Sequence, residues 1–159
     1  MTTTTTQPNV RPCFSLQDAA QLAQTYYGIT ATAQELPSER DQNFYLKATS
    51  GQELVLKISG TAEEYAVLDF QNKAVAHLHA VTPELPCPQV WATKAGETIA
   101  TVTGVNGANH FVRLLTYLSG KPLALVKPQA PELLRNLGAY LGKLDEALAT
   151  FDHPATHRH

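Results

Sequence analysis

The order of apolar and polar residues predicts a helix followed by three short strands in the N-terminal half of the chain. Apolar residues recur at helical spacing over 16–27, with Ser15 as the expected N-cap and Gly28 as the expected C-cap. The period then changes to two, which is typical of strands with one buried face. Three such segments are separated by polar turns, at 29–36, 44–48 and 54–58. Short turns between strands favour an antiparallel meander.

A second helix is predicted directly after the third strand. Thr61 is its expected cap, and Glu63 and Glu64 are expected in its first turn, where the helix dipole favours acidic side chains. The prolines that follow, from Pro83 onward, end this helix. Its apolar face is predicted from residues spaced three or four apart, namely Val67, Phe70, Ala74 and Leu78.

The C-terminal half is predicted to add a hairpin, a further strand and a long helix. The hairpin is expected to turn near 94–97, a fifth strand covers 110–117, and a leucine-rich helix covers about 131–151. The predicted fold class is therefore α+β. It consists of a five-stranded antiparallel sheet with a helix after the third strand, an N-terminal helix and a long C-terminal helix.

Composition narrows the class of protein. The chain has 159 residues, of which 43% are hydrophobic, so it can bury the core of one ordinary domain. Residues 1–12, which carry a threonine tract, are expected to form a disordered arm. A net charge of -2 gives no reason to expect binding to nucleic acid or to a membrane, and no apolar run is long enough to span a bilayer. Cys13 and Cys87 lie far apart in the sequence, which suits a reducing cytoplasm.

Lys57 attracts chemical interest because it lies within an apolar strand. From its position alone, the simplest interpretation is an exposed strand lysine, since every second residue of a strand can face water. By the same reasoning, the polar segment 38–41 is an ordinary hairpin loop. No metal site is expected, although His153, His157 and His159 lie close together, because a flexible chain end holds metal ligands poorly.

Three segments of the chain resemble the amino-terminal lobe of the aminoglycoside phosphotransferase family. They are 36–44, 54–59 and 111–120, and they contain the runs SERDQNF and RLLTYLSG. The sequence is most similar to the hydroxylysine kinase-like branch and to the phosphotransferase domains fused to class III aminotransferases in bacteria. The resemblance extends from about Tyr27 to Arg158. It implies a protein kinase-like amino-terminal lobe over 13–120, followed over 121–159 by the hinge exit, a helix and the start of a linker to a catalytic lobe.

The resemblance also implies a nucleotide site, for ATP or GTP with Mg²⁺ in the intact protein. Lys57 resembles the lysine that neutralises the α- and β-phosphates. Gln71 occupies the position of the helix glutamate that orients this lysine, so a neutral side chain replaces the ion-pair partner. Glu64 is a second candidate for that partner, although an acid in a first helical turn has a simpler explanation. The remaining implied residues are Ser38, Asp41 and Asn43 in the phosphate loop, and Thr116, Tyr117 and Leu118 in the hinge that holds adenine.

The catalytic signature expected of this family does not occur in the sequence. There is no His-Gly-Asp run and no following metal-binding aspartate, so the chain alone is predicted to be inactive and to bind ATP weakly or undetectably. The first hypothesis is the nucleotide-binding lobe of a phosphotransferase that acts on a hydroxyl of a small amino-containing substrate, present here as a fragment. The alternative is a non-catalytic binding, regulatory or oligomerising module, with self-association through an exposed apolar surface.

Overall fold

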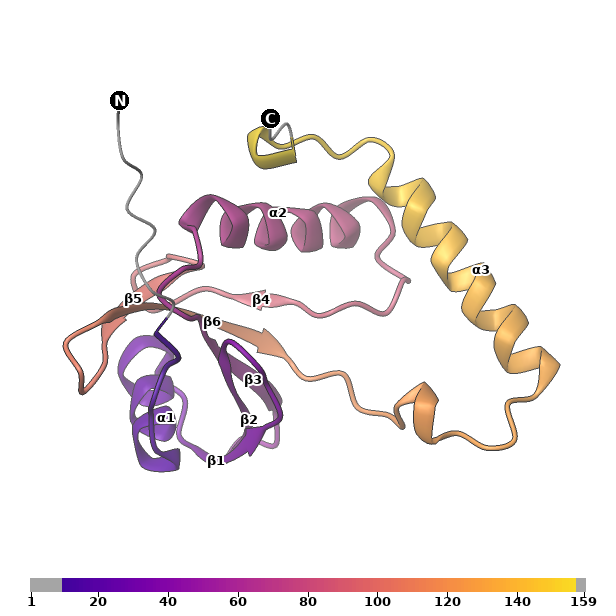
Figure 1. Ribbon diagram of the computed structural model, residues 1–159. Coiled ribbons are helices and arrows are strands. Elements are labelled where there is room, and N and C mark those ends of the chain that lie inside the picture. The colour runs from indigo at the N-terminus through magenta and orange to yellow at the C-terminus, as the bar shows by residue number, and fades with distance from the viewer. Residues whose placement is uncertain (1–9, 157–159) are drawn as a thin grey trace.

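An antiparallel sheet with helices on both faces dominates the computed structural model, which describes residues 10–156 (Figure 1). The strand order is β1-β2-β3-β6-β4, with β5 also paired to β6. This arrangement confirms the predicted α+β fold class with a helix after the third strand. The strands are β1 (Ala31–Leu36), β2 (Gln42–Ala48), β3 (Glu53–Ile58), β4 (Val90–Trp91), β5 (Ala100–Thr103) and β6 (Asn109–Thr116).

The predicted hairpin around 94–97 is wrong, because its two arms pair with β6 and not with each other. Val90 lies opposite Leu115, and Ala100 lies opposite Val112, so β4 and β5 follow one another along the same edge of β6. The residues between β4 and β5 form a turn, which is closed by a hydrogen bond from the Thr93 N–H to the Glu97 carbonyl at 2.7 Å. The two predicted arms are therefore present as short strands, but each of them pairs with β6.

The N-terminal helix forms as the sequence predicts. The α1 helix (Leu16–Leu22) continues as a π-helical turn, η1 (Ala23–Tyr27), and ends at Gly28, whose φ of 71° is left-handed. At its start the Ser15 hydroxyl accepts from the Asp18 N–H, and the Asp18 carboxylate accepts from the Ser15 N–H. The helix covers the sheet face that carries the core, where the fully buried side chains include Phe44, Leu56 and Leu114.

The α2 helix (Tyr65–Val81) covers the opposite face of the sheet (Figure 1). Its N-cap is Glu64, so Thr61 and Glu63 precede the helix and the predicted cap is wrong. The predicted apolar face is correct at Leu78, but the other buried residues of α2 are Leu68 and Asn72, which were not predicted. Phe70 points to another side of the helix and packs on Phe151, with 5.7 Å between ring centroids. A polar residue, Asn72, takes a buried place that apolar periodicity alone cannot show.

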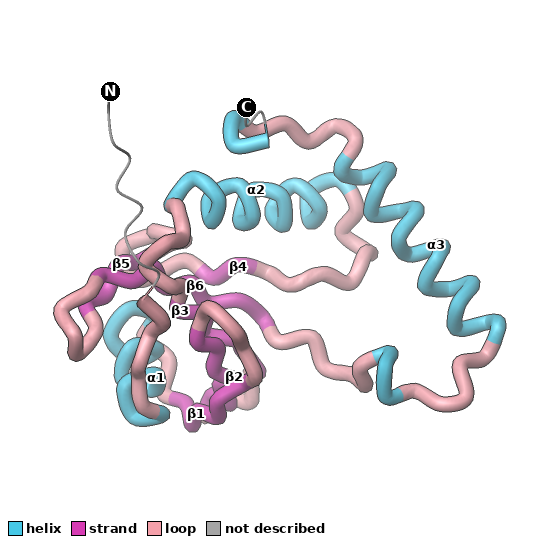
Figure 2. Tube along the Cα trace, viewed as in Figure 1, coloured by secondary structure: helices cyan, strands magenta, loops and turns pink. Residues whose placement is uncertain are grey.

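After β6 the chain leaves the sheet through a long connection that contains the short helix η2 (Leu123–Leu125), and it then enters α3 (Pro131–Leu148) (Figure 2). Only the C-terminal part of α3 reaches α2. There, Ala147 joins Leu78 and Leu85 in a small second core. The Tyr140 hydroxyl donates to the Pro86 carbonyl at 2.8 Å and fixes the middle of α3.

The segment that follows α3 folds back over the outer side of α2 and ends in the short helix η3 (Pro154–Thr156). His153 is buried there, and its Nε2 lies 3.1 Å from the Asp69 carboxylate, which also binds Lys73. His153 is thus held in place, contrary to the expectation of a flexible chain end. His157 and His159 lie outside the described residues.

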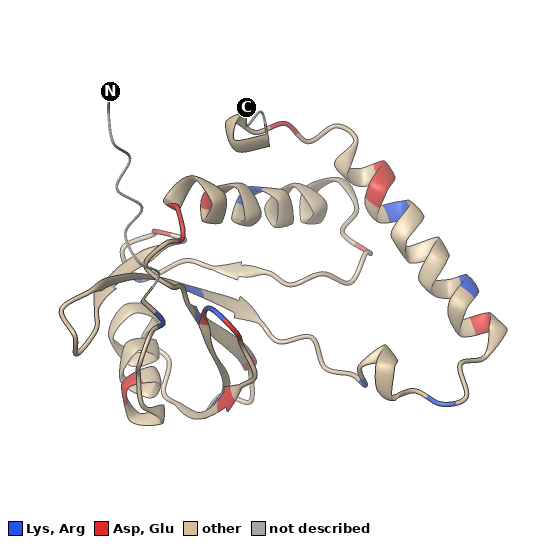
Figure 3. Cartoon of the chain, viewed as in Figure 1, with Lys and Arg blue, Asp and Glu red and all other residues tan. Residues whose placement is uncertain are grey.

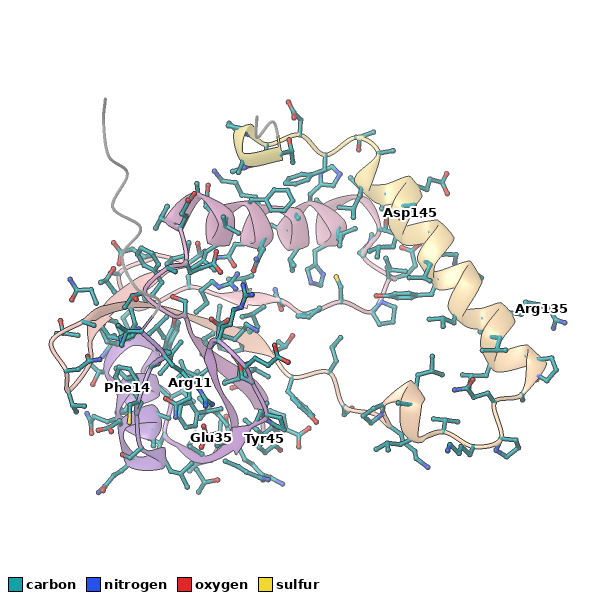
Figure 4. The ribbon with its side chains drawn as sticks, viewed as in Figure 1. Arg11, Phe14, Glu35, Tyr45, Arg135 and Asp145 are labelled. Atoms are coloured by element: carbon teal, nitrogen blue, oxygen red, sulfur yellow. The ribbon has the colours of Figure 1, made fainter. Side chains whose placement is uncertain are left out.

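The predicted disordered arm, 1–12, falls largely outside the described residues. Its last part is held to the sheet and to the start of the α2 segment. The Val10 N–H donates to the Thr61 hydroxyl at 2.8 Å, and the Thr61 N–H donates to the Val10 carbonyl. Arg11 lies 3.9 Å from Glu35 of β1 (Figure 4). No helix among the described residues is long and apolar enough to cross a membrane.

Candidate functional site

Lys57 lies near the C-terminal end of β3, on the face that α2 covers. Its neighbours across the sheet are Asn43 of β2 and Arg113 of β6. This face is opposite the core face, since side chains alternate along a strand and Leu56 and Ile58 are fully buried. Lys57 is half-buried, and within residues 10–156 no hydrogen bond or ion pair reaches its ammonium group. The described structure therefore offers a cation without a protein partner.

Burial lowers the pKa of the Lys57 ammonium from its ordinary value, because a charged group loses hydration in the interior. The neighbouring Arg113 lowers this pKa further by charge repulsion, and Asp41 acts in the opposite direction. The same loss of hydration lowers the pKa of Arg113, which remains charged at neutral pH. Lys57 and Arg113 are therefore two adjacent cations on this face of the sheet, and the carboxylates nearest to them in charge effect are Asp41 and Glu63.

The predicted phosphate loop lies at the same end of the sheet as Lys57. It connects β1 to β2 over 37–41, and β2 then places Asn43 directly opposite Lys57. The Asp41 carboxylate accepts a hydrogen bond from the Gly60 N–H at 3.2 Å, which ties the loop to the residues that follow β3. Ser38 is half-buried within the loop. The Asn43 amide oxygen is buried and has no partner in the described part of the chain.

The predicted hinge begins at the opposite end of β3, where Leu54 pairs with Thr116. The Thr116 N–H donates to the Gln89 carbonyl, and the Tyr117 N–H donates to the Glu53 carbonyl, both at 2.9 Å. The N–H groups of both residues are therefore already used as hydrogen-bond donors to neighbouring strands or loops. Leu118 is the next residue, and it is half-exposed. If the hinge holds a base, its free donor comes from Leu118 or from a residue beyond it.

The Tyr117 ring is also fixed in place. It packs edge-on against Tyr45 of β2, with 4.9 Å between ring centroids, and the Tyr45 hydroxyl donates to the Glu53 carboxylate at 2.5 Å. Gly120 then turns the chain out of the sheet with a φ of 150°, a conformation that residues with a side chain rarely adopt. The exit from β6 is therefore anchored before the long connection to α3 begins.

Gln71 lies on α2, at the helix position where the sequence predicts a partner for Lys57. In the structure its amide oxygen accepts from Arg113 Nη2 at 2.8 Å. Arg113 Nη1 donates to the amide oxygen of the next residue, Asn72, at 2.9 Å. No role for Arg113 was predicted from the sequence. Its signal was present, since Arg113 interrupts the apolar strand of 111–115, but only the strand register places it beside Lys57.

The structure thus divides the predicted site residues between the two ends of β3. Asn43, Lys57 and the loop with Ser38 and Asp41 lie at one end, with Gln71 linked to them through Arg113. Thr116, Tyr117 and Leu118 lie at the other end. Leu54 and Lys57 are three residues apart, which corresponds to about 10 Å along an extended strand. Among residues 10–156, no group of three or more side chains is arranged to hold a metal ion.

Comparison of the sequence with known proteins decides its family. Residues 32–159 match the phosphotransferase enzyme family, APH. The chain belongs to this family. Hydroxylysine kinase of Bos taurus is 34% identical to it over 162 residues, and hydroxylysine kinase of Mus musculus is 32% identical over 161 residues. Each alignment covers 93% of this chain but 42% of the relative, so the chain spans less than half the length of these phosphotransferase relatives.

Two solved structures share the fold at low sequence identity. Amicoumacin kinase hAmiN, in a complex with AMP-PNP, Ca²⁺ and Ami, matches with a TM-score of 0.73 at 14% identity. The microcompartment-associated aminopropanol kinase matches with a TM-score of 0.68 at 16% identity. Both alignments cover 89% of this chain, and they cover 42% and 43% of the two kinases respectively. The family resemblance of the sequence and the kinase-like fold are confirmed.

Proposed function

We propose that this chain is the nucleotide-binding lobe of a small-molecule phosphotransferase that uses ATP or GTP with Mg²⁺. The observation that carries the proposal is Lys57, a half-buried lysine on the third strand with no protein partner among the described residues. In kinases the strand lysine binds the nucleotide phosphates and is one of the few protein groups that do so directly. Membership of the phosphotransferase enzyme family supports this assignment.

The arrangement along β3 supports the same assignment. In this proposal the phosphates lie at the Lys57 end, beneath the loop that carries Ser38 and Asp41, and the base lies at the hinge formed by 116–118. The two ends are about 10 Å apart along the strand, which an extended nucleotide can span from base to phosphate. Asn43, with its unpartnered amide oxygen, lies beside Lys57 and would face a ribose hydroxyl or a phosphate-bound water.

We further propose that the acceptor is a hydroxyl of a small molecule that also carries an amino group. Hydroxylysine and aminopropanol, which the names of two kinds of relative give, both combine a hydroxyl with an amine. The groups that orient this hydroxyl and bind Mg²⁺ are expected in the part of the relatives' length that this chain does not span. Without them, the chain by itself would bind a nucleotide weakly and transfer no phosphate.

Cys13 and Cys87 are both free, which agrees with a site of action in the cytoplasm.

One side of the α3 helix is apolar and exposed, and we expect another part of the intact protein to cover it. Leu134, Leu137 and Leu141 lie on one stripe of the helix and are 48%, 36% and 48% exposed. Figure 3 shows that charged residues lie towards the two ends of α3 and not in its middle. We assign this stripe to contact with the rest of the phosphotransferase. If the alternative of an oligomerising module holds instead, Leu137→Ser will convert a dimer to a monomer in analytical ultracentrifugation.

A nucleotide titration followed by NMR tests the proposed function. Mg-ATP added to the ¹⁵N-labelled chain should shift amide signals around Lys57 and around Leu118, at opposite ends of β3. Lys57→Met should weaken these shifts, whereas Lys47→Met should not, because Lys47 is exposed and lies opposite Glu53 on the same two strands. Absence of shifts at either end up to millimolar ATP would overturn the proposal. Micromolar affinity that Lys57→Ala abolishes would show that the expectation of weak binding is wrong.

A further inference from the structure

Arg113 of β6, whose side chain is buried and 5% exposed, joins the sheet to the α2 helix. Arg113 Nη1 donates to Asn72 at 2.9 Å, and Nη2 donates to Gln71 at 2.8 Å. The two acceptors are consecutive residues in the second turn of α2. A planar guanidinium with two parallel donors fixes both the distance and the rotation of a helix that presents two acceptors.

Both acceptors are neutral amides, and this distinguishes the contact from an ion pair. Within the described residues no carboxylate forms a salt bridge with Arg113 or with Lys57. In protein kinases a glutamate on the helix after the third strand pairs with the strand lysine, and this pair sets the position of the helix. Here Gln71 stands near that place but turns to Arg113, on the strand next to Lys57.

We propose that Arg113 is the positioning residue that docks α2 onto the sheet in place of a lysine–glutamate pair, and that it leaves Lys57 unpaired for an anionic ligand. The docking role does not depend on nucleotide binding; only the use of Lys57 by a phosphate rests on the proposed function. One consequence is that loss of the Lys57 side chain does not release α2. A second is that the charge of Arg113 acts on Lys57 from the adjacent strand.

The charged groups around the pair support this separation of roles. Arg113 faces Lys57 from β6. The negative charge of Asp41, in the loop between β1 and β2, raises the pKa of both cations. Glu63, in the segment that precedes α2, also raises the pKa of Arg113 through its negative charge. The α2 helix itself contributes only the two amides to this contact. Among the described residues Lys57 therefore has no fixed partner, while Arg113 has two.

Hydrogen–deuterium exchange of the α2 amides, residues 65–81, tests the docking role in the full chain. Arg113→Met keeps the length and apolar stem of the side chain but removes both bonds, and it should speed exchange in α2 by about tenfold. Lys57→Met should not speed this exchange. Gln71→Glu should slow it, because a carboxylate strengthens the bond to Arg113. Should Arg113→Met fail to fold, Gln71→Leu removes one acceptor at an exposed position and should speed exchange by a few-fold.

An NMR titration of the Lys57 side chain separates this role from general structural support. Arg113→Met should raise the pKa of Lys57, because it removes the adjacent positive charge, and Gln71→Glu should raise it by adding a negative one. The proposal is overturned if Lys57→Met speeds α2 exchange as much as Arg113→Met does. It is also overturned if Gln71→Glu speeds exchange, or if neither variant raises the Lys57 pKa. All these readouts are made without nucleotide, so they can fail or succeed independently of ATP binding.

Discussion

Replacement of Lys57 by methionine should make the protein more stable, even though Lys57 is the residue most closely tied to the proposed function. The side chain is half-buried, has no partner in the described structure and lies directly opposite Arg113 on β6. Like charges that face each other across two strands cost up to about 1 kcal/mol. Methionine has a similar length, is apolar and removes this repulsion.

The magnitude follows from two contributions. Relief of the repulsion with Arg113 is worth about 0.5 kcal/mol, because Lys57 is partly exposed and solvent screens its charge. Relief of the lost hydration of the ammonium should be of similar size, so the free energy of unfolding should rise by about 1 kcal/mol at pH 7. For a chain of this length, that change corresponds to an increase in Tm of about 2–4 °C.

Urea and thermal unfolding of the wild type and Lys57→Met measure this difference. Lys47→Met is the matched control, because Lys47 is exposed and lies opposite Glu53, so its removal should be neutral or slightly destabilising. The pKa of Lys57 is lower in the folded than in the unfolded state. The unfolded chain therefore binds more protons between these two values, and the wild type should gain stability as the pH rises through that window. The advantage of Lys57→Met should shrink accordingly.

A destabilising effect of Lys57→Met at pH 7, with Lys47→Met neutral, would refute this reasoning. It would mean that a favourable contact holds the Lys57 ammonium in the folded chain. An advantage that stays constant from pH 7 to pH 10 would also contradict it, since deprotonation of Lys57 in the wild type must remove the charge penalty.

Two further predictions concern the helices. The hydrogen bond from Lys73 lowers the pKa of the Asp69 carboxyl; His153 acts in the same direction, and burial acts against both. The ionised Asp69 carboxylate therefore stabilises the fold above the ordinary pKa of 3.8, and this stabilisation is lost as the pH falls through the lower pKa of the folded state. Asp69→Asn should thus cost about 0.5–1 kcal/mol in urea unfolding at pH 7 and progressively less as the pH falls below 3.8, and a cost that does not change with pH would contradict this view. Gly138→Ala and Gly142→Ala should each stabilise the chain by about 0.5–1 kcal/mol, because both lie within α3 with open space around a new methyl group. Gly104→Ala is the contrast, since its methyl would lie 3.3 Å from His110 Nε2, and it should lower Tm.

The sequence predicted most of the secondary structure because the signals were local. The capping box of Ser15 and Asp18, the left-handed Gly28 and the period-two strands are all properties of neighbouring residues. The errors arose where partners are distant in sequence. The segments around Val90 and Ala100 have the pattern of strands, but both pair with β6 and not with each other, because β6 offers both of them one continuous edge.

The candidate site shows the same division. The apolar strand around Lys57 and the family resemblance are enough to single out that residue from the sequence, and the role of the loop and hinge residues stays a prediction. Arg113 could not be assigned, because its importance depends on β3–β6 register and on the rotation of α2. A buried polar position on a helix, such as Asn72, breaks the apolar period that identifies a helix face, and so the predicted face was only partly correct.

The sequence by itself determined most helices and strands, the family and the lysine at the centre of the proposed site. These features can be predicted because periodicity, helix caps and motifs depend on residues that are close together in the sequence. Only the tertiary structure decided which charges meet. Strand pairing brought Arg113 beside Lys57, and helix packing gave Arg113 two amide acceptors while leaving Lys57 without a partner in the described structure. The physical reason is that electrostatic and hydrogen-bond energies depend on distance and burial, and both are set by contacts between residues far apart in the chain.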